Sequence, residues 1–381
     1  MIKVDKIVPG GQAIATDESG KKIFFWNALP GEIITDYIIT KNKSHYAEAI
    51  VNRIDNPSSY RAEPKDECFL ATSPWQMMDY HYELHLKQEL IVEIFREHHI
   101  NVSVPQIFTD NKEYYYRNKM EYALFYDKEQ AKIFPAFHAR GSHNKIPITH
   151  SSIERPELFS HAQKIIDELN TSHEEARKYQ SLLLRCNQQG EVSGGLFENH
   201  QPHPTFKNLT DTILGYKYSY SPNGFFQINL PVYEMALKEI KKHITTDDVL
   251  DLYAGVGTIG LSVARDKNLT LIECDKSAYQ ELVNNSNGKA TTINTKSEEA
   301  LDYISPDATV ILDPPRAGCD HKLIDKLLDI LPPKIIYLSC NPSTQARDVS
   351  ILLQKYHIET IKTFNFFPRT PHIENLIILS K

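Results

Sequence analysis

Residues 249–260 read VLDLYAGVGTIG, an apolar strand pattern followed by three glycines spaced G-x-G-x-x-G and then by a helical pattern. Glycines at the carboxyl end of a first strand let the backbone approach a ligand closely. Further apolar runs stand at 270–273, 310–313 and 335–339, separated by helical patterns. This alternation predicts an α/β fold, a doubly wound Rossmann-like domain whose parallel sheet has helices on both faces.

Glu273 ends the second predicted strand, where its carboxylate can accept both hydroxyl groups of an adenosine ribose. The glycine loop and Glu273 together predict an adenosine-containing ligand, either a nicotinamide dinucleotide or S-adenosylmethionine. Asp251, directly before the loop, would repel a pyrophosphate but suits a cationic methyl donor. The residues that end the other predicted strands favour one of these two ligands.

Two strand ends carry reactive side chains. Asp313 opens Asp313-Pro314-Pro315-Arg316, where two prolines predict a stiff extended turn that holds the carboxylate over the sheet edge, ready to grip a planar base. Cys340 follows the strand 335–339 and can act as a nucleophile once the pKa of its thiol is lowered. The alternatives are a turn cap for Asp313 and a small buried hydrophobe for Cys340.

A second carboxylate and an amide complete the candidate site. Glu374 precedes the last predicted strand, 376–379, and suits a general base that His372 could support. Gln227 brings an amide to the entry of the same region. A surface glutamate and a polar helix cap are the competing interpretations.

These residue types fit one chemistry. Carbon-5 of uracil is too weak a nucleophile to take a methyl group directly, whereas addition of a thiolate at carbon-6 makes it enolate-like. A base then removes the carbon-5 proton and the thiol leaves. A thiol, a base and a grip on the ring are needed, and Cys340, Glu374 and Asp313 supply them. Hydride transfer needs neither the thiol nor the late carboxylate.

The rest of the chain divides by pattern. Short strands and close turns over residues 1–56 predict a small OB-like β-barrel, or else a simple sheet. Residues 57–210 mix strands with helical patterns and predict a central α+β domain, and residues 211–381 form the predicted ligand-binding domain.

Composition limits the partners and the compartment. The 381 residues carry a formal net charge of −7, so a polyanion must be held by local patches or by a shaped site. Five scattered cysteines form no disulfide framework, and we see neither a signal peptide nor an apolar run long enough to span a membrane. We expect a cytoplasmic monomer that does not bind membranes.

The motifs now on the page resemble the RNA uracil-C5 methyltransferase family, which forms 5-methyluridine in tRNA and large-subunit rRNA. The resemblance covers nearly the whole chain through four segments in the family's order, which are residues 251–257, 313–316, 339–342 and 367–374. It implies that S-adenosylmethionine is the methyl donor, that Cys340 is the nucleophile and that Glu374 is the base. It further implies donor contacts by five residues, Gln227, Tyr253, Thr258, Glu273 and Asp313, and places Ser297 near the adenine edge.

Residues 1–56 resemble the TRAM domain that precedes many of these enzymes and is taken to bind RNA. Lys41, Lys43 and Arg53 are candidate phosphate contacts there, or simply a solvated face. Many TRAM-bearing relatives hold a [4Fe–4S] cluster with four cysteines. Here Cys68 stands alone, so we expect no iron–sulfur cluster, and we expect apolar side chains such as Phe69 and Trp75 to fill its space.

Several alternatives stay open. His81 and His85 have helical metal-ligand spacing but no third ligand, so we expect no metal. Residues 114–119 mix tyrosines with basic groups that could clamp a flipped-out base, or form a strand with core tyrosines. The rival functions are an RNA cytosine-C5 methyltransferase, an amino-methyltransferase and a noncatalytic RNA-binding protein on the same fold. We expect large-subunit rRNA as the substrate, with tRNA as the alternative.

Overall fold

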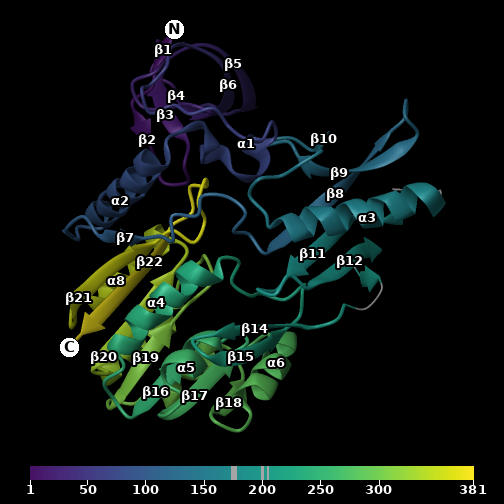
Figure 1. Ribbon diagram of the computed structural model, residues 1–381. Coiled ribbons are helices and arrows are strands. Elements are labelled where there is room, and N and C mark those ends of the chain that lie inside the picture. Colours follow the sequence, from purple (N-terminus) through teal and green to yellow (C-terminus); the bar gives the residue numbers. More distant parts are fainter. Residues whose placement is uncertain (173–177, 199–200, 204–205) are drawn as a thin grey trace.

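The computed structural model describes residues 1–172, 178–198, 201–203 and 206–381. Figure 1 shows three parts: a curled N-terminal sheet, a central sheet with one long helix, and a C-terminal sheet covered by helices. The mixed α/β class and the doubly wound C-terminal part agree with the predicted fold.

The N-terminal sheet curls back on itself. It comprises β1 (Ile2–Lys3), β2 (Lys6–Ile7), β3 (Ala13–Thr16), β4 (Lys22–Trp26), β5 (Ile33–Asn42) and β6 (Tyr46–Asn56), in the order β1-β5-β6-β4-β3-β2. The edge strands β1 and β2 are successive pieces of one segment, so the two ends of the sheet approach each other, as the ring in Figure 1 shows. The predicted small barrel is present as this curled six-stranded sheet, without an assigned closure among the described strands.

The next segment connects the first part to the third. It forms α1 (Phe69–Thr72), the 3₁₀ turn η1 (Pro74–Met77), α2 (Tyr80–Glu97) and β7 (Gln106–Phe108). Asp79 caps α2 by accepting from the Tyr82 N–H at 3.0 Å. The apolar face of α2 lies in the core that the N-terminal and C-terminal sheets share, and β7 joins the C-terminal sheet beside β21 (His357–Phe364). In space, therefore, α2 and β7 pack with the N-terminal and C-terminal sheets, whereas α1 also contacts the central sheet through Cys68 and Ala71.

The central sheet is antiparallel and covered on one face. Its strands are β8 (Lys119–Asp127), β9 (Lys132–His138), β10 (Lys145–Pro147), β11 (Ser181–Cys186), β12 (Val192–Glu198) and β13 (Gln201–His203), in the order β10-β9-β8-β11-β12-β13. Helix α3 (Pro156–Ser172) covers the face to which Met120, Tyr122 and Leu184 point. Because neighbouring strand residues point to opposite faces, Lys119 and Arg185 point away from α3.

The C-terminal part begins with the hairpin of β14 (Leu209–Ile213) and β15 (Tyr216–Tyr220) and with α4 (Leu230–Lys242). Its eight-stranded sheet has the order β18-β17-β16-β19-β20-β22-β21-β7. The remaining strands are β16 (Asp248–Asp251), β17 (Asn268–Glu273), β18 (Thr291–Asn294), β19 (Ala308–Leu312), β20 (Lys334–Ser339) and β22 (Glu374–Ser380). Strands β16 to β20 are parallel, whereas β22 runs antiparallel between β20 and β21.

Helices cover both faces of this sheet. They are α5 (Thr258–Val263), α6 (Lys276–Ser286), α7 (His321–Ile330) and α8 (Pro342–Leu352), with the 3₁₀ turns η3 (Ser297–Glu299) and η4 (Leu301–Tyr303). Helices α4, α5 and α6 share one core with the sheet, and α2, α7 and α8 share the other. Within the described residues, no helix is both long and apolar enough to cross a membrane.

Candidate active site

Five polar side chains end on one face of the C-terminal sheet. Along β16 and β17, Val249 and Leu271 point into the core beneath α4, α5 and α6, whereas Leu250 and Ile272 point to the opposite core. Strand alternation therefore puts Asp251 and Glu273 on the α4 side. Asp313 follows Leu312, which lies in the opposite core, so Asp313 falls on the α4 side as well.

Cys340 and Glu374 face each other across two antiparallel strands. Ser339 of β20 pairs with Asn375 of β22, and the same register sets Cys340 opposite Glu374 one step further toward the edge. Directly opposed residues have Cβ atoms about 5 Å apart and share one face. Leu338 and Leu376 lie in the α4-side core, so the alternation also puts Cys340 and Glu374 on that face. The predicted nucleophile and the predicted base are therefore brought together.

Asp251 is a buried carboxylate with few partners. Its Oδ2 accepts from the Gly260 N–H at 3.0 Å, and the Tyr253 N–H makes a weaker contact that also favours the charged form. Within the described part of the chain, Oδ1 has no partner at full hydrogen-bond geometry. Burial, and then the charge of Glu273, raise the pKa of Asp251 to about 7. Gly260 is required because a Cβ at this position would lie 3.0 Å from Asp251 Oδ2 and against Leu271. The site thus offers an unused acceptor to a cation.

The predicted ribose contact already holds the glycine loop. Glu273 Oε2 accepts from the Gly255 N–H at 2.8 Å, and Oε1 accepts from the Asp275 N–H at 2.6 Å. Gly255 and Gly257 have φ values of +55° and +90°, which side chains rarely adopt, and α5 starts directly after them. Each carboxylate oxygen keeps a second lone pair for a ligand.

Burial makes Asp313 and Glu374 weakly acidic. The pKa of Asp313 rises to about 7 because of burial and the nearby Asp251. The pKa of Glu374 rises well above its usual value because of burial and the nearby Asp313, and Arg316 opposes this shift. The pKa of the Cys340 thiol rises to about 11 for the same two reasons, burial and the charges of Glu374 and Asp313. A cation placed among these groups would lower the pKa values of Asp313, Glu374 and Cys340, and also that of Asp251.

Arg316 is a neighbour of Cys340 that the sequence did not single out. A side-chain hydrogen bond from Arg316, together with its charge, lowers the pKa of Cys340 and opposes the carboxylates. The Arg316 carbonyl accepts from Asn341 Nδ2 at 2.8 Å, which ties the Asp-Pro-Pro-Arg turn to the residue after the thiol. Arg316 Nη2 also lies 3.5 Å from His372 Nδ1.

His372 is set up as a neutral side chain. Burial, and then the positive charges of Arg316 and Lys87, lower its pKa to about 4. Its polar contact is with Arg316 and its ring packs edge-on against Phe367. The predicted support of Glu374 by His372 is thus at most indirect, because no bond between the two side chains is formed here.

The remaining predicted donor contacts are held by neighbouring segments. Gln227 lies three residues before the start of α4, largely buried, and its carbonyl accepts from Asn118 Nδ2 at 3.0 Å. The Thr258 hydroxyl lies 2.9 Å from the Tyr233 hydroxyl of α4. The half-buried Tyr253 has side-chain contacts with Ser297 and Cys319, and the Ser297 hydroxyl donates to the Leu252 carbonyl. Thr258 and Ser297 therefore use their hydroxyl groups within the protein.

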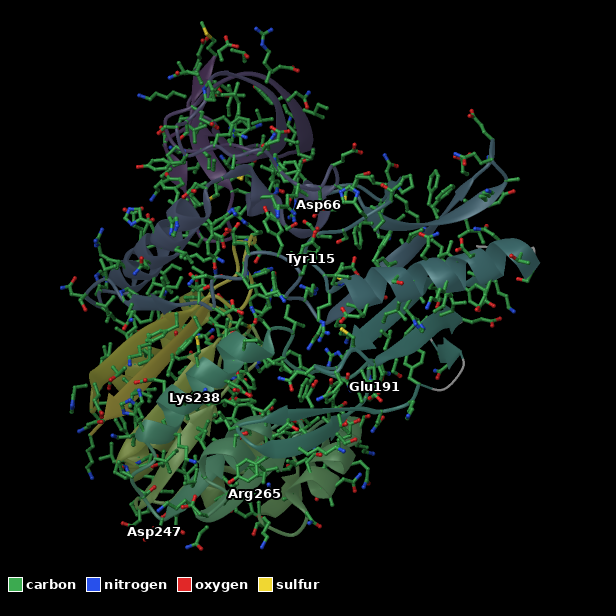
Figure 2. The ribbon with its side chains drawn as sticks, viewed as in Figure 1. Asp66, Tyr115, Glu191, Lys238, Asp247 and Arg265 are labelled. Carbon is green, nitrogen blue, oxygen red and sulfur yellow. The ribbon has the colours of Figure 1, made fainter. Side chains whose placement is uncertain are left out.

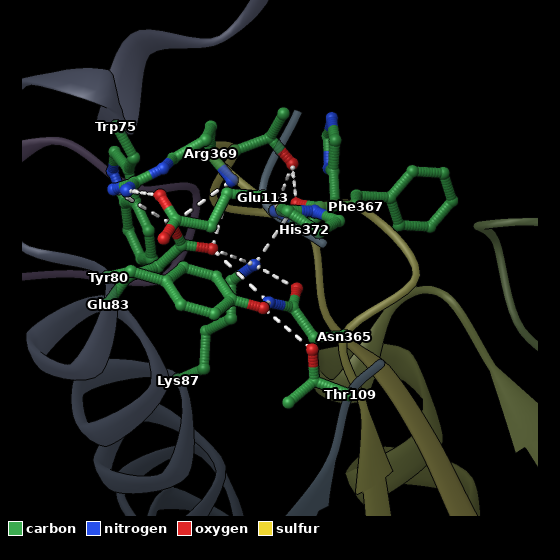
Figure 3. A network of polar contacts seen from close by, with 12 residues as sticks. Trp75, Tyr80, Glu83, Lys87, Thr109, Glu113, Asn365, Phe367, Arg369 and His372 are labelled. Atoms are coloured by element: carbon green, nitrogen blue, oxygen red, sulfur yellow. Dashed lines mark hydrogen bonds and ion pairs between the residues drawn. The ribbon is translucent and has the colours of Figure 1, made fainter. Parts of the chain in front are cut away.

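Buried charged side chains of α2 hold the loop that leads to Glu374 (Figure 3). Lys87 Nζ donates to Glu83 Oε1 at 2.9 Å, to Asn365 Oδ1 at 2.7 Å and to the Phe367 carbonyl at 3.1 Å. Both Glu83 oxygens accept from the Arg369 N–H at 3.0 Å. Glu83 and Lys87 are fully buried on α2, so this network joins a helix outside the C-terminal sheet to the loop before the predicted base.

The segment predicted to lack an iron–sulfur cluster packs through apolar side chains and is also held by hydrogen bonds: Trp75 is fully buried and Phe69 packs against the same core. Asp66 accepts from the Ser152 N–H at 3.0 Å, from the Ser152 hydroxyl at 2.7 Å and from Gln76 Nε2 at 2.7 Å. Figure 2 shows Asp66 between the N-terminal part and the central sheet. Cys68 points into the central core, and Trp75 is buried in another core, with its Nε1 donating to Gly11.

Other candidate residues are paired or isolated. Lys41 forms an ion pair with Glu48 at 2.8 Å, and Arg53 lies 3.3 Å from Asp55, whereas Lys43 is exposed. His85 contacts Glu89 at 3.2 Å. Across the described ranges, no group of three or more His, Cys, Asp or Glu side chains could hold a metal ion.

Known proteins resemble this chain in three ways. Residues 299–381, which carry Asp313, Cys340 and Glu374, match the model of the family described as tRNA (Uracil-5-)-methyltransferase. An uncharacterized RNA methyltransferase of Enterococcus faecalis is 28% identical over 94% of this chain and 92% of its own length. One from Nanoarchaeum equitans is 29% identical over 95% and 90%.

These matches confirm the predicted resemblance. The chain is similar to RNA methyltransferases over nearly its whole length, and residues 299–381 are similar to the uracil-5 enzymes. The fold of the chain is also that of a solved protein, the Pyrococcus abyssi tRNA (uracil-54, C5)-methyltransferase in complex with S-adenosyl-L-homocysteine. The two structures have a TM-score of 0.78 at 22% identity, and the match covers 100% of this chain and 99% of the other.

Proposed function

We propose that this protein transfers a methyl group from S-adenosylmethionine to carbon-5 of a uridine in RNA. One observation carries the proposal: the β20–β22 register sets a thiol, Cys340, directly opposite a carboxyl group, Glu374, at the ligand-binding edge of the sheet. An RNA cytosine-C5 methyltransferase pairs its thiol with a second one near Asp313, but Cys319 is buried against Asp348 and Tyr337.

The residues at the edge fit a sulfonium donor. Asp251, through its Oδ1, and the weakly acidic Asp313 can both become negatively charged, and a nearby cation would stabilise these charged forms. Glu273 and the glycine loop suit the ribose, and Gln227 and Tyr253 are further donor contacts that the resemblance implies. Bound S-adenosylmethionine supplies an electrophilic methyl group at this edge. The family match and the S-adenosyl-L-homocysteine in the Pyrococcus abyssi relative's structure support this donor.

The chain's own residues then perform the remaining steps. Burial and the two carboxylates raise the pKa of Cys340, whereas Arg316 opposes them and favours the thiolate. As a thiolate, the Cys340 sulfur adds to carbon-6 of uracil, and this addition makes carbon-5 nucleophilic. Asp313 grips the ring, since a carboxyl group with a raised pKa can either donate to or accept from its polar edge. After carbon-5 is methylated, the Glu374 carboxylate removes its proton, the carbon-5–carbon-6 double bond reforms, and the carbon–sulfur bond to Cys340 breaks.

Replacing Cys340 by Ala tests the proposal. We expect incorporation of labelled methyl groups into RNA to vanish, while binding of S-adenosyl-L-homocysteine is kept. Cys186, a buried thiol of the central sheet, provides the matched control in Cys186→Ala, which should methylate RNA. Methylation that persists in Cys340→Ala would refute the covalent route.

The RNA itself is a separate part of the proposal. The TRAM-like N-terminal part led us to expect rRNA, whereas the matched family's description and the Pyrococcus abyssi relative's title refer to tRNA. Mass mapping of 5-methyluridine in tRNA and rRNA from cells with and without the gene separates the two. The predicted cytoplasmic location and monomeric state go with this proposal. If no uridine loses its methyl group in either RNA, the proposed activity is wrong.

A further inference from the structure

Lys119 and Arg185 form a pair of like charges in the central sheet. They are direct cross-strand partners in the β8–β11 register, so both project from the face opposite α3. Like charges placed directly opposite each other destabilise a sheet. Arg185 is only 1% exposed. A buried arrangement of this kind costs free energy unless negative charge compensates it.

No ion pair neutralises these two cations within the described residues. Neither side chain has a carboxylate oxygen within 4.0 Å there, nor does the nearby Arg117. Carboxyl groups act from farther off: Glu121 on Lys119, and Asp211 and Glu281 on Arg185. Ser181 donates to Glu121, and the Tyr220 hydroxyl donates to Asp211. Among the residues that the structure describes, Arg185 Nε and Nη1 have no hydrogen-bond partner.

Backbone carbonyl groups hold the two cations in place. Lys119 Nζ donates to the Asn223 and Gly224 carbonyls, both at 3.1 Å, and Arg185 Nη2 donates to the Phe226 carbonyl at 3.1 Å. The guanidinium also lies 5.5 Å from the centre of the Tyr220 ring. This loop runs directly into Gln227 at the predicted donor site, so the charged pair adjoins the active site.

The same loop offers an exposed aromatic surface. Phe225, between the residues that bind Lys119 and Arg185, is 75% exposed. Arg117 acts on the catalytic side as well, since its charge contributes to lowering the pKa of His372. An exposed ring beside unneutralised cations is the combination that single-stranded nucleic acid uses, with phosphate on the cations and a base on the ring.

We propose that Lys119, with Arg185 behind it, forms a subsite for a phosphodiester group of the RNA next to the target nucleotide. Lys119 makes the contact because Nζ is partly accessible, and the buried Arg185 adds positive potential. The subsite deepens the proposed function, since it assumes an RNA substrate. It also explains how a chain with a net charge of −7 attracts a polyanion.

A binding measurement without catalysis tests the subsite. The probe is a fluorescent uridine decamer, titrated by anisotropy over a range of salt concentrations. We expect Lys119→Gln to bind about fivefold to tenfold more weakly at low salt, with the salt slope reduced by about 0.7, as expected for one lost phosphate contact. Lys119→Arg should restore both. Lys132, an exposed lysine on β9 of the same sheet, provides the control Lys132→Gln.

A footprint on the wild-type protein does not depend on any variant folding. Burial, and then the charges of Arg185 and Arg117, lower the pKa of Lys119 to about 8, so its amine acylates readily at neutral pH. We expect the decamer to protect Lys119 from acylation, read by mass spectrometry, and to leave Lys132 unprotected. Equal binding by Lys119→Gln and Lys132→Gln, or an unprotected Lys119, overturns the subsite. If the wild-type protein binds RNA in a Lys119-dependent way but methylates no uridine, the proposed function is wrong and the subsite stands.

Discussion

Gly11 of the N-terminal sheet lies directly against Pro371, three residues before Glu374. A methyl group added to Gly11 would overlap the Pro371 ring and would lie 3.3 Å from Trp75 Nε1. Trp75 Nε1 in turn donates to the Gly11 carbonyl at 3.0 Å, and the Trp75 N–H donates to the Arg369 carbonyl at 3.1 Å. The N-terminal part is therefore fitted to the loop that carries the predicted base.

We expect Gly11→Ala to slow methyl transfer by about tenfold, because a displaced Pro371 moves Glu374 out of register with Cys340. The measurement is the single-turnover rate, with the affinity for S-adenosyl-L-homocysteine measured beside it and expected to change little.

Gly10→Ala is the matched control. Gly10 has a φ of +96°, close to the +89° of Gly11, but open space surrounds the added methyl group. Both variants carry the same backbone strain, so only the contact with Pro371 differs. Equal rates in the two variants would show that this contact does not matter.

Lys87 on α2 is the next test of how the loop is held. Replacing Lys87 by Met removes three hydrogen bonds and leaves the Glu83 carboxylate buried with less compensation. Breaking a buried ion pair typically costs about 3–5 kcal/mol, and we expect a loss of that order in urea unfolding. Arg96→Met, at an exposed position near the end of the same helix, should cost less than about 1 kcal/mol. A loss in Lys87→Met as small as in this control would contradict the role of the network.

The active-site edge could be predicted from sequence because each of its residues follows its own strand. Asp251, Asp313 and Cys340 each end an apolar run, and the carboxyl ends of parallel strands meet at one edge. Glu374 was predicted from its place before the last strand and again from the resemblance, but its pairing with Cys340 depends on the antiparallel insertion of β22, which the local pattern does not reveal.

Contacts between distant segments could not be predicted in the same way. Lys87 reads as an ordinary polar position of a helix, and only the fold reveals that it meets Asn365. Trp75 and Phe69 pack as expected, but the bonds between Asp66 and Ser152 were not predicted, because they form only once the fold buries both groups together. Lys119 and Arg185 become a pair only through the β8–β11 register.

Glu374→Gln separates the two chemical stages. The glutamine cannot remove the carbon-5 proton, whereas Cys340 can still add to carbon-6, so we expect turnover to fall by about 10²–10⁴-fold. A methylated RNA–protein adduct that survives denaturing electrophoresis should accumulate. Cys340→Ala combined with Glu374→Gln should form none. If Glu374→Gln turns over RNA normally, another group is the base.

The affinity for the methyl donor should depend on pH. Asp251 and Asp313 have pKa values raised to about 7, so they are neutral below that pH, and a sulfonium favours their charged forms. We therefore expect the affinity for S-adenosylmethionine to rise with pH through about 7 and then to level off. S-adenosyl-L-homocysteine has an uncharged sulfur and should show a flatter curve. Calorimetric titrations from pH 5.5 to about 8.5 measure both, and parallel curves would count against the charge argument.

Asp251→Asn extends this argument to stability. Because the folded-state pKa of Asp251 lies above its ordinary value of 3.8, the folded protein holds an extra proton between about pH 4 and 7, and stability falls as pH rises through that window. An asparagine can still accept from the Gly260 N–H but never becomes charged. We expect the donor-free variant to melt at least about 2 °C higher at pH 8, while its affinity for S-adenosylmethionine falls. Asp248→Asn, at the exposed start of the same strand, should change neither the melting temperature nor this affinity. A lower melting temperature for Asp251→Asn at pH 8 would mean that the Asp251 charge is already compensated without the donor.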